Sequence, residues 1–401
     1  MWKQNPPPDR RPVLLPIPVA RAATSMAPPP LPAAALIEEL VEEILLRLPP
    51  TEPASLFRAA LVCKAWCRLI SGARFRRRFR EFHRTPPMLG LICSSLPIDK
   101  NVGIARFVPA TAFCSPPADR RHCRAIDARH GRVLLLQCCA YGKPDVLVVW
   151  DPITGDQREL PTPPRHAYIL TAAILCAAAG ICDHLDCHRG PFLVVFMGFC
   201  TEGAFICTYS PDAGTWSDNI YTDQPDGFVI SASKVLVGNA LYFGFPISNT
   251  ALRYDLELHE TCLMELPPRH STRQRFVLLT MDDGAVGFAT VHEFKLYMWS
   301  RKDGPQVDAG WTQNRVIELQ TLLCSNGILA SPDVVGFADG LGVVFLREDD
   351  VLFTIDLKSC EVKKLSKGRV MYNTLAYMSF YTPALGAACT GEGSSTGASG
   401  A

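Results

Sequence analysis

The pattern of hydrophobic and polar positions changes its period once along the chain, near residue 85. From about residue 31 to 80, apolar residues recur three and four positions apart, which is the spacing that places them on one face of an α-helix. After "HRTPP" the pattern becomes a series of short apolar runs separated by Gly, Pro, Asp and Asn, typical of many short strands joined by turns. The change predicts a small helical domain followed by a large β domain.

A loose repeat runs through the strand-rich region. Five segments share an apolar run that ends in an aromatic residue or Ile, then usually Asp or Ser, a polar turn and a second alternating run, as in "VLVVWDPITGDQRELP" and "VLFTIDLKSCEVKKLS". Such a segment is typical of a hairpin whose first strand is largely buried. The residues that end the first runs, about 45 to 60 residues apart, are Trp150, Tyr209, Tyr254, Trp299 and Ile355.

This period is close to one blade of a β-propeller of the kelch or WD type. One hairpin cannot bury its own apolar face, so we expect the repeats to stack against one another. With roughly 300 residues available, six or seven blades fit the period, and the register of the repeat does not decide between these numbers.

The helical region is expected to contain three short helices. The first ends before Pro49 and Pro50; "SLFRAALVCKAWCRLI" forms the second, with Ser55 as a possible cap and Gly72 at its end; "ARFRRRFREF" forms the third. Apolar residues of the first helix spread over roughly 180° of its surface, whereas a surface helix usually buries a stripe of about 100°. About 50 residues are also few for a self-sufficient core, so this pattern predicts a partner.

Composition divides the chain into four regions. We expect a disordered Pro- and Ala-rich leader over 1–30, a helical domain over 31–82, the β domain over 85–383, and a flexible tail over 384–401. The predicted fold class is α+β multidomain, with a small all-α domain followed by an all-β propeller-like domain.

Charge and cysteine usage indicate an ordinary globular protein. With 40 Lys and Arg against 39 Asp and Glu, the chain has no global electrostatic attraction to nucleic acid or to a membrane. The longest apolar run has about 14 residues, fewer than the roughly 20 that span a bilayer. The 16 cysteines are scattered and several lie in apolar runs, which predicts reduced thiols and a cytoplasmic or nuclear location.

The helical region resembles the F-box. "LIEELVEEILLRLPP", "LVCKAWCRLI" and Phe75 follow the family pattern of an Ile-Leu pair, a Leu-Pro that closes the first helix, and Val-Cys-Lys-x-Trp. The chain departs from the pattern at its start, where Leu36 and Ile37 stand in place of a frequent Leu-Pro. "HRTPPMLG" and "IDARHGRVLLL" are similar to phrases in a large group of plant F-box proteins, particularly from grasses. The resemblance spans roughly residues 31–381.

The resemblance implies a non-catalytic substrate receptor of a ubiquitin ligase. In this family the F-box binds a Skp-type adaptor, which connects to a cullin and a RING protein, while the C-terminal domain captures a target protein. The sequence does not identify that target, and no catalytic residue, cofactor, metal, nucleic acid or membrane contact is expected. Carried over by motif position, the adaptor-binding residues are Leu36, Leu40, Ile44, Leu48, Pro49, Leu61, Val62, Lys64 and Trp66. The alternative is that they form only the core of a helical bundle.

Two other functions stay open. A scaffold outside the ligase would keep the adaptor contact without cullin-dependent turnover of what it binds. A propeller enzyme would need ionisable residues that converge at the channel mouth, and the loop candidates Asp127, His130, Asp183 and His184 show no spacing that brings them together. The sequence also has no phosphate-binding Gly loop, HExxH or GxSxG motif.

Two local clusters allow a second interpretation. "CDHLDCH" holds two Cys and two His, but zinc sites usually combine a close Cys pair with a second pair set well apart, and four residues separate Cys182 from Cys187. An exposed loop between blades is therefore preferred to a metal site. In "RFRRRFREFHR" the spacing of Phe75, Phe79 and Phe82 marks one buried helical face, which favours a solvated Arg face over nucleic-acid binding.

Overall fold

The structure is a computed structural model. It describes residues 33–95, 104–113, 119–137, 145–165, 167, 169–178, 182–185, 187–201, 203–222, 233–271, 274–302, 310–323, 331–367 and 373–382. The predicted leader (1–30) and tail (384–401) lie outside the described residues. The chain divides into two compact units, Met1–Glu43 and Ile44–Ala401.

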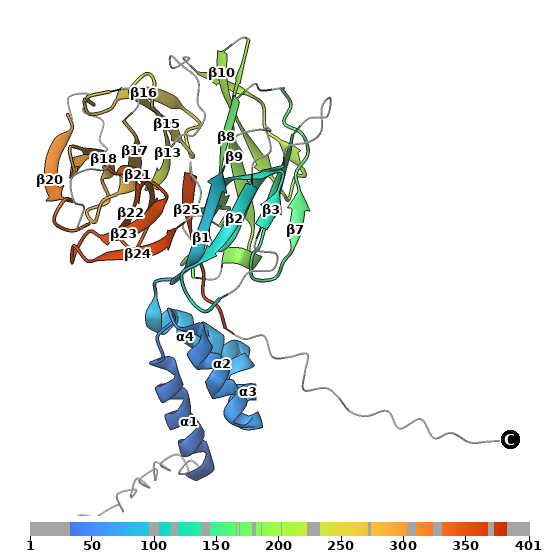
Figure 1. Ribbon diagram of the computed structural model, residues 1–401. Coiled ribbons are helices and arrows are strands. Elements are labelled where there is room, and N and C mark those ends of the chain that lie inside the picture. Colours follow the sequence, from blue (N-terminus) through green and yellow to red (C-terminus); the bar gives the residue numbers. More distant parts are fainter. Residues whose placement is uncertain are drawn as a thin grey trace, which may run out of the picture. The chain divides into compact units, whose positions relative to one another are not determined.

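Within the described residues, four helices precede the strands (Figure 1). They are α1 (Ala33–Leu46), α2 (Pro53–Val62), α3 (Lys64–Ser71) and α4 (Ala73–His83). Pro53 lies in the first turn of α2, where its missing N–H is not needed by the helix. The Ser55 hydroxyl does not cap this helix, contrary to the prediction, because it lies inside the first turn and donates to Glu52 Oε2 at 3.3 Å.

The prediction of one helix from "SLFRAALVCKAWCRLI" is wrong, because the chain breaks at Cys63. This residue is extended (φ −159°, ψ 164°), and its carbonyl accepts the N–H of Cys67 at 3.0 Å to begin α3. A straight helix of this length would extend about 24 Å. The break instead lets α2 and α3 pack against each other. As predicted, α3 ends at Gly72, whose N–H donates to the Leu69 carbonyl at 3.1 Å.

The part of the helical region that belongs to the second unit has an apolar core of its own. Its large buried side chains are Leu45, Leu46, Leu56, Ile70, Phe75 and Phe79. The prediction that Phe82 shares this face is wrong, since its side chain is 51% exposed. The imidazole of His83, the last residue of α4, completes this face. Its ring centroid lies 4.5 Å from that of Phe79, and its Nε2 lies 2.9 Å from the Leu46 carbonyl oxygen.

The β region is a ring of six antiparallel blades in the part of the chain that the structure describes (Figure 1). With the inner strand first, the first blade consists of β25 (Asn373–Met378), β1 (Met88–Ser95), β2 (Ile104–Pro109) and β3 (Asp119–Arg121). The second blade consists of β4 (Cys123–Arg129), β5 (Arg132–Gln137), β6 (Val146–Trp150) and β7 (Gln157–Glu159). The third blade consists of β8 (Ile169–Cys176), β9 (Phe192–Cys200), β10 (Gly203–Ser210) and β11 (Thr215–Trp216), and β12 (Ile220–Thr222) also pairs with β10.

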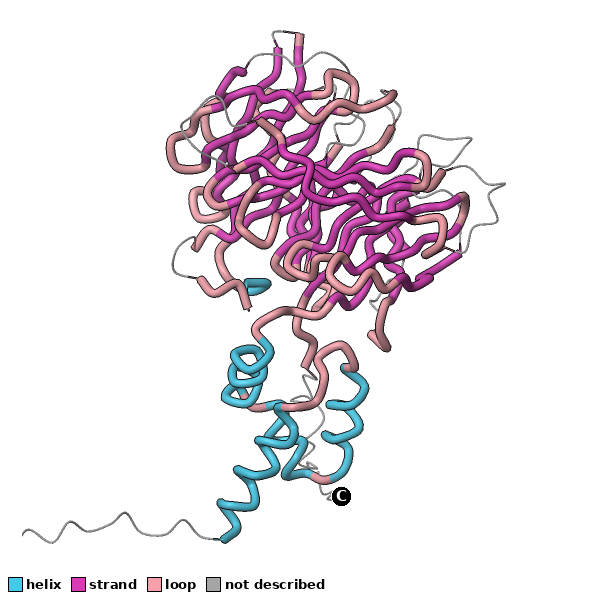
Figure 2. Tube along the Cα trace, turned by 90° about the vertical axis from the view of Figure 1, so that its left-hand side faces the viewer, coloured by secondary structure: helices cyan, strands magenta, loops and turns pink. Residues whose placement is uncertain are grey.

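The other three blades have four strands each. The fourth blade consists of β13 (Ser233–Val237), β14 (Ala240–Phe245), β15 (Thr250–Asp255) and β16 (Thr261–Glu265). The fifth consists of β17 (Phe276–Thr280), β18 (Val286–His292), β19 (Lys295–Arg301) and β20 (Thr312–Glu318). The sixth consists of β21 (Asp333–Ala338), β22 (Val343–Glu348), β23 (Val351–Asp356) and β24 (Val362–Lys367). Figure 2 shows the strands of the β region, with the short 3₁₀ helix η1 (Cys187–Arg189) at the lower edge of that region.

The ring is closed by a blade built from both ends of the β region. Strand β25 pairs antiparallel with β1, so that Leu375 lies opposite Ile92. The other five blades are each continuous in sequence. This pairing removes the free sheet edge that an open array of blades would leave.

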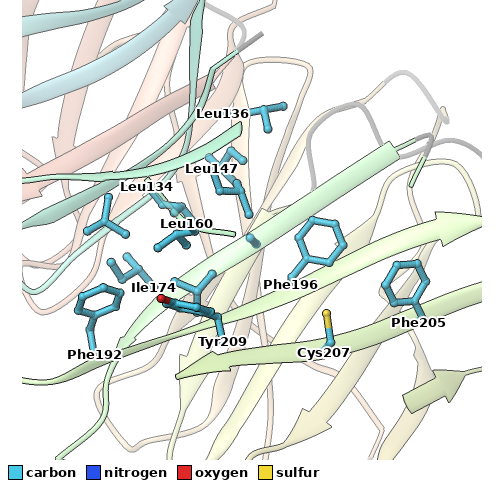
Figure 3. Close-up of a cluster of buried hydrophobic side chains, with 14 residues drawn as sticks. Leu134, Leu136, Leu147, Leu160, Ile174, Phe192, Phe196, Phe205, Cys207 and Tyr209 are labelled. Atoms are coloured by element: carbon cyan, nitrogen blue, oxygen red, sulfur yellow. The ribbon is translucent and has the colours of Figure 1, made fainter. Parts of the chain in front are cut away.

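The inner strands of the blades bury side chains on both faces, which explains the continuous apolar runs in the sequence. In β5, Val133 and Leu135 join one apolar cluster while Leu134 and Leu136 join the next, because successive side chains of a strand point to opposite faces. Figure 3 shows the second of these clusters, where Leu134 and Leu147 of one blade meet side chains of the next blade. Blade-to-blade contact is therefore the main source of apolar burial.

The five predicted run-ending residues all lie at or near the end of the third strand of a blade. Four of them are buried and Trp299 is half-buried. Three are followed by Asp, and each carboxylate caps the turn to the fourth strand. Asp151 Oδ1 accepts the N–H of Ile153 at 2.8 Å, and Asp356 Oδ1 accepts the N–H of Ser359 at 2.8 Å. The polar turn predicted from the sequence is thus an Asp-capped turn.

No helix within the described ranges has the length and apolar character needed to cross a membrane.

Candidate interaction sites

The helical region leaves large apolar side chains exposed. In the second unit, Ile44 is 64% exposed, Leu61 is 78% exposed and Val62 is 65% exposed. Leu40 of the first unit is equally open, and it precedes Ile44 by four residues in α1, which places both on one helical face. The wide apolar arc of α1 thus has an exposed side that differs from its buried side at Leu45.

The local structure explains why these side chains stay open. On α2 the buried residues are Pro53, Leu56, Ala59 and Ala60. Leu61 follows Ala60 by one residue and is therefore turned about 100° from it around the helix. Because the chain leaves the helix at Cys63, no later turn of α2 covers this surface.

The other predicted adaptor-binding residues differ in exposure. Pro49 and Lys64 are exposed, whereas Leu48 and Trp66 are half-buried. The side chain of Leu36 lies outside the described residues. Exposure is compatible with the predicted contact, and the contact itself stays a prediction.

A cavity of about 530 Å³ lies in the central channel of the ring. Its wall is formed by residues of the inner strands β4, β13, β17, β21 and β25. The β8–β9 connection adds Asp183, His184 and His188, and the segment between α4 and β1 adds Arg84. A cavity of this size fits a small ligand or the tip of a peptide.

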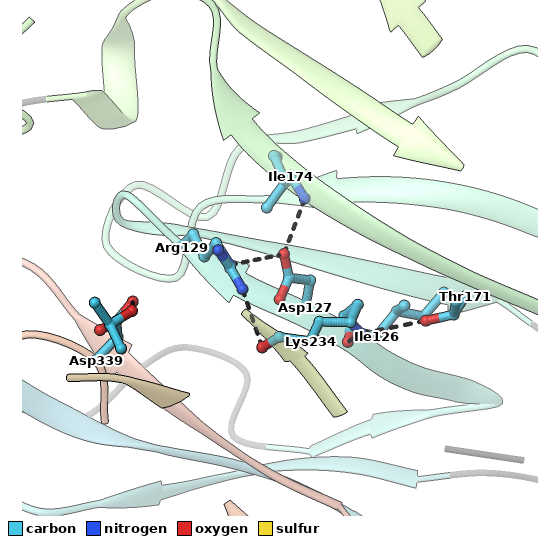
Figure 4. A network of polar contacts seen from close by, with 8 residues as sticks. Ile126, Asp127, Arg129, Thr171, Ile174, Lys234 and Asp339 are labelled. Atoms are coloured by element: carbon cyan, nitrogen blue, oxygen red, sulfur yellow. Dashed lines mark hydrogen bonds and ion pairs between the residues drawn. The ribbon is translucent and has the colours of Figure 1, made fainter. Parts of the chain in front are cut away.

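A polar network crosses the channel and ties three successive blades (Figure 4). Asp127 Oδ2 on β4 accepts the N–H of Ile174 on β8 at 2.9 Å and lies 3.3 Å from Arg129 Nε. Lys234 Nζ on β13 donates to the Ile126 carbonyl at 2.7 Å and to Thr171 Oγ1 at 3.3 Å. These bonds replace the ladder hydrogen bonds that neighbouring inner strands do not form.

The same device recurs between other blades. The N–H of Ala125 on β4 donates to Ser94 Oγ on β1 at 3.1 Å. The N–H of Leu278 on β17 donates to Ser233 Oγ on β13 at 2.7 Å. In each case a side chain of one blade satisfies a buried backbone donor of the next, which fixes the blades to each other.

Burial shifts two pKa values at the channel. Burial lowers the pKa of Lys234 to about 8, and the charge of Asp127 partly opposes this shift. Burial also lowers the pKa of His130 to about 4, with a further contribution from His184, whose ring centroid lies 4.8 Å away. At neutral pH the His130 imidazole is therefore neutral.

The sequence spacing of Asp127, His130, Asp183 and His184 does not bring them together, but the fold does. All four line the channel cavity, because the β4–β5 turn and the β8–β9 connection of the neighbouring blade reach the same mouth. Sequence spacing carries no information on this convergence, since it depends on how two blades stack. The Asp127 carboxylate is already engaged with Ile174 and Arg129.

The "CDHLDCH" segment also differs from its predicted setting. It connects β8 to β9 within one blade, not one blade to the next, and Cys187 is buried. The fold brings Cys176, the last residue of β8, to Cys182, His184 and Cys187. Sequence reasoning missed Cys176 because it lies in an apolar run and was read as core.

Comparison with known proteins places these regions in a family. The family described as F-box protein AT5G49610-like, beta-propeller, matches residues 124–384, more than half of the chain. The chain belongs to this family. The F-box domain matches residues 35–78, which fall within α1 to α4, so the helical region is the F-box and the β region is the propeller. The predicted family and fold are confirmed.

Three solved structures that resemble the chain have low sequence identity to it. One is a functionally unknown protein from Desulfotomaculum acetoxidans, with 10% identity, 72% of this chain and 89% of that chain covered, and a TM-score of 0.39. TolB from Acinetobacter baumannii has 10% identity, 75% and 70% coverage, and a TM-score of 0.37. The extracellular domain of the putative one component system BT4673 from B. thetaiotaomicron has 11% identity, 61% and 28% coverage, and a TM-score of 0.34. No curated protein matches the chain.

Proposed function

We propose that this protein is the substrate receptor of a cullin–RING ubiquitin ligase of the SCF type. Its F-box binds a Skp-type adaptor, as F-box domains generally do, and its propeller binds a target protein. The observation that supports this function best is the exposure of Ile44, Leu61 and Val62 on an F-box joined to a closed propeller. Cullin and RING protein attach through the adaptor.

Burial of the exposed F-box side chains can contribute enough free energy for such a contact. Full burial of an aliphatic side chain contributes about 1.5 to 3 kcal/mol. Association costs at least about 4 kcal/mol in lost translational and rotational freedom. One residue is therefore not enough, and the F-box side chains bind as a set together with polar contacts at its edge, for which Lys64 is placed.

The propeller supplies recognition and no chemistry. Its strands are committed to blade-to-blade packing, so the target binds through connecting segments at the channel mouths, where loops are free to vary. The transfer of ubiquitin takes place on the partner proteins. Reduced thiols in apolar strands, such as Cys207, support a location in the cytoplasm or nucleus.

Co-expression of the full chain with a Skp-type adaptor tests the first half of this function. We expect an equimolar complex with the wild type and none with Ile44→Asp or Leu61→Asp, because a carboxylate would be buried in the interface. Leu258→Asp in the propeller is the matched control, since Leu258 is 66% exposed and Ile44 is 64% exposed. Circular dichroism verifies that the β domain is folded. A folded wild type that does not bind the adaptor, or equal loss with Leu258→Asp, would contradict the proposal.

Turnover of captured proteins separates a ligase subunit from a scaffold. Proteins that bind the propeller are identified with Ile44→Asp, and their half-lives are then compared in cells that express wild type or this variant. A longer half-life with the variant, and with the wild type after cullin inhibition, supports the receptor. If the wild type binds the adaptor but the captured proteins have equal half-lives with wild type and with the variant, the protein is a scaffold instead.

A further inference from the structure

Three thiols and one imidazole converge on the β8–β9 connection. The donor atoms of Cys176, Cys182, His184 and Cys187 all lie within 4.8 Å of one another. Cys182 Sγ lies 3.3 Å from Cys187 Sγ, and His184 Nδ1 also lies 3.3 Å from Cys187 Sγ. We propose that these four residues bind one Zn²⁺ in a structural Cys₃His site.

The distances fit tetrahedral coordination. Zn–S bonds of about 2.3 Å and Zn–N bonds of about 2.0 Å place the donors of a tetrahedral site about 3.5 to 3.8 Å apart. Two separations in this cluster are 3.3 Å, just below that range, and none exceeds 4.8 Å, so small side-chain rotations are enough to reach it. A disulfide between Cys182 and Cys187 requires about 2.05 Å and would leave Cys176 and His184 without a role.

The sheet and the short helix hold the two ends of the site. Cys176 is fixed in β8 opposite Phe192 of β9, and the N–H of Ala177 donates to the Pro191 carbonyl at 3.1 Å. Cys187 begins η1, where its carbonyl accepts the N–H of Gly190 at 2.9 Å. These bonds place one thiol on each side of the connection before any metal binds.

In the middle of the connection, His184 directs its backbone N–H and its imidazole towards cysteine sulfur atoms. The N–H of His184 points to Cys182 Sγ at 3.4 Å. His184 has a φ of 59°, in the left-handed region that a residue other than Gly adopts at an energetic cost. This backbone directs Nδ1 to the cluster although the rest of the side chain is exposed. A bound metal supplies the interaction that offsets the cost.

A buried cation balances the charge of the site. Zn²⁺ with three thiolates and one imidazole has a net charge of −1. The Arg132 guanidinium is buried, attracted to Cys187 and Cys176 as well as to Asp151, and one of its donors, Nη1, has no hydrogen-bond partner among the described residues. The Asp151 carboxylate already attracts this cation, and a zinc–thiolate centre of net charge −1 would be a second anionic partner for it.

Four protein ligands leave no open position, so the zinc is structural and does not activate water. Its effect is on the shape of the connection, which contributes Asp183, His184 and His188 to the wall of the channel cavity. Zinc would hold this rim in one conformation and so define one side of the propeller's binding surface. The site does not depend on the adaptor contact or on ligase activity.

Metal analysis of the purified full chain tests the proposal. We expect about one zinc per chain by plasma mass spectrometry, and after exchange a Co²⁺ spectrum with thiolate charge-transfer bands and the intense visible bands of a tetrahedral site. Cys187→Ser is expected to lose the metal. Cys262→Ser is the matched control, because Cys262 is exposed on β16 and far from the cluster in sequence, and it should retain the metal.

His184→Asn keeps the test decisive if the Cys187 variant does not fold. The exposed His184 side chain should tolerate this change, and chelator competition should show zinc affinity reduced by more than the roughly 10- to 100-fold that loss of an outer partner costs. Three results would overturn the proposal. They are a folded wild type that neither retains nor takes up zinc, zinc binding unchanged in both site variants, and a Cys182–Cys187 disulfide in the protein isolated under reducing conditions.

Discussion

The F-box leaves several large apolar side chains exposed, whereas the propeller buries most of its own. Half of the large exposed hydrophobic side chains within the described residues, five of ten, lie between Leu40 and Phe82, although the propeller is several times larger. The propeller covers each blade by two neighbours because its ring is closed through β25 and β1. A short helical module has no such closure, so its outer faces stay available to a partner. The propeller covers its own core, whereas the F-box leaves large apolar side chains exposed.

The two regions also differ in how they satisfy polar groups. The propeller carries polar side chains between its blades, where Asp127, Ser94 and Ser233 accept backbone N–H groups of neighbouring blades. The F-box positions its helices mainly by aromatic and aliphatic packing, as at Phe75 and Phe79. Substitutions should therefore act mainly on stability in the propeller and mainly on binding at the open F-box surface.

The largest effect is expected from a cavity in the propeller core. Phe243→Ala should lower the free energy of unfolding by about 3 to 5 kcal/mol, because the side chain is fully buried between two blades. Ile44→Ala, at an exposed F-box position, should change it by less than about 0.5 kcal/mol. Denaturant titration followed by circular dichroism measures both, and equal losses would remove the contrast between the regions.

The next effect concerns the charge network. Asp127→Asn leaves two cations, Arg129 and Lys234, without their carboxylate and should cost about 3 kcal/mol. Adding Lys234→Met should restore part of the loss, since the uncompensated ammonium is removed. Chemical unfolding of the single and double variants measures the coupling. Strictly additive losses would show that the network does not act as a unit.

Lys234 also predicts a dependence of stability on pH. Its pKa falls from 10.5 to about 8 in the folded protein, so above pH 8 the unfolded chain binds more protons than the native one. The native state is therefore stabilised as pH rises from about 8 towards 10.5, by about 2 kcal/mol over 1.5 pH units. The difference in unfolding free energy between wild type and Lys234→Met isolates this effect. A constant difference across that range would contradict it.

The Asp-capped turns should give a smaller effect. Asp356→Ala removes two backbone hydrogen bonds and should cost about 1 to 2 kcal/mol, and Asn should recover part of it. The N–H of Ser359 is the first cause that lowers the pKa of Asp356 below 3.8. This contribution is therefore complete above pH 3.8 and lost as pH falls through the lower folded pKa. Acid unfolding of wild type and Asp356→Ala should converge at low pH, and parallel curves would exclude this origin.

The smallest effect is expected where the F-box is open. Leu61→Ser and Phe82→Ser should each change the free energy of unfolding by less than about 0.5 kcal/mol, because both side chains are largely exposed. Thermal unfolding of the isolated full chain measures this. A loss above 2 kcal/mol at Leu61 would mean that its surface is covered within the chain and not by an adaptor.

Much of the fold could be predicted from local sequence patterns. The period-3.6 segment, the F-box motif and the Asp-capped hairpins all depend on residues a few positions apart, so they were visible without a structure. Leu61 and Val62 were placed by motif position, and the structure leaves both exposed. The break at Cys63 carries no Pro or Gly signal and was missed, as was the exposure of Phe82.

By itself the sequence determined that a helical F-box precedes a β domain of repeated hairpins, because hydrophobic period and turn chemistry act over short stretches of chain. Only the tertiary structure decided that the described residues form six blades, that β25 closes the ring on β1, and that Cys176 joins Cys182, His184 and Cys187. These features arise where segments far apart in sequence, or on the two sides of a connection, are brought together by blade stacking. Their distances depend on packing and not on spacing along the chain.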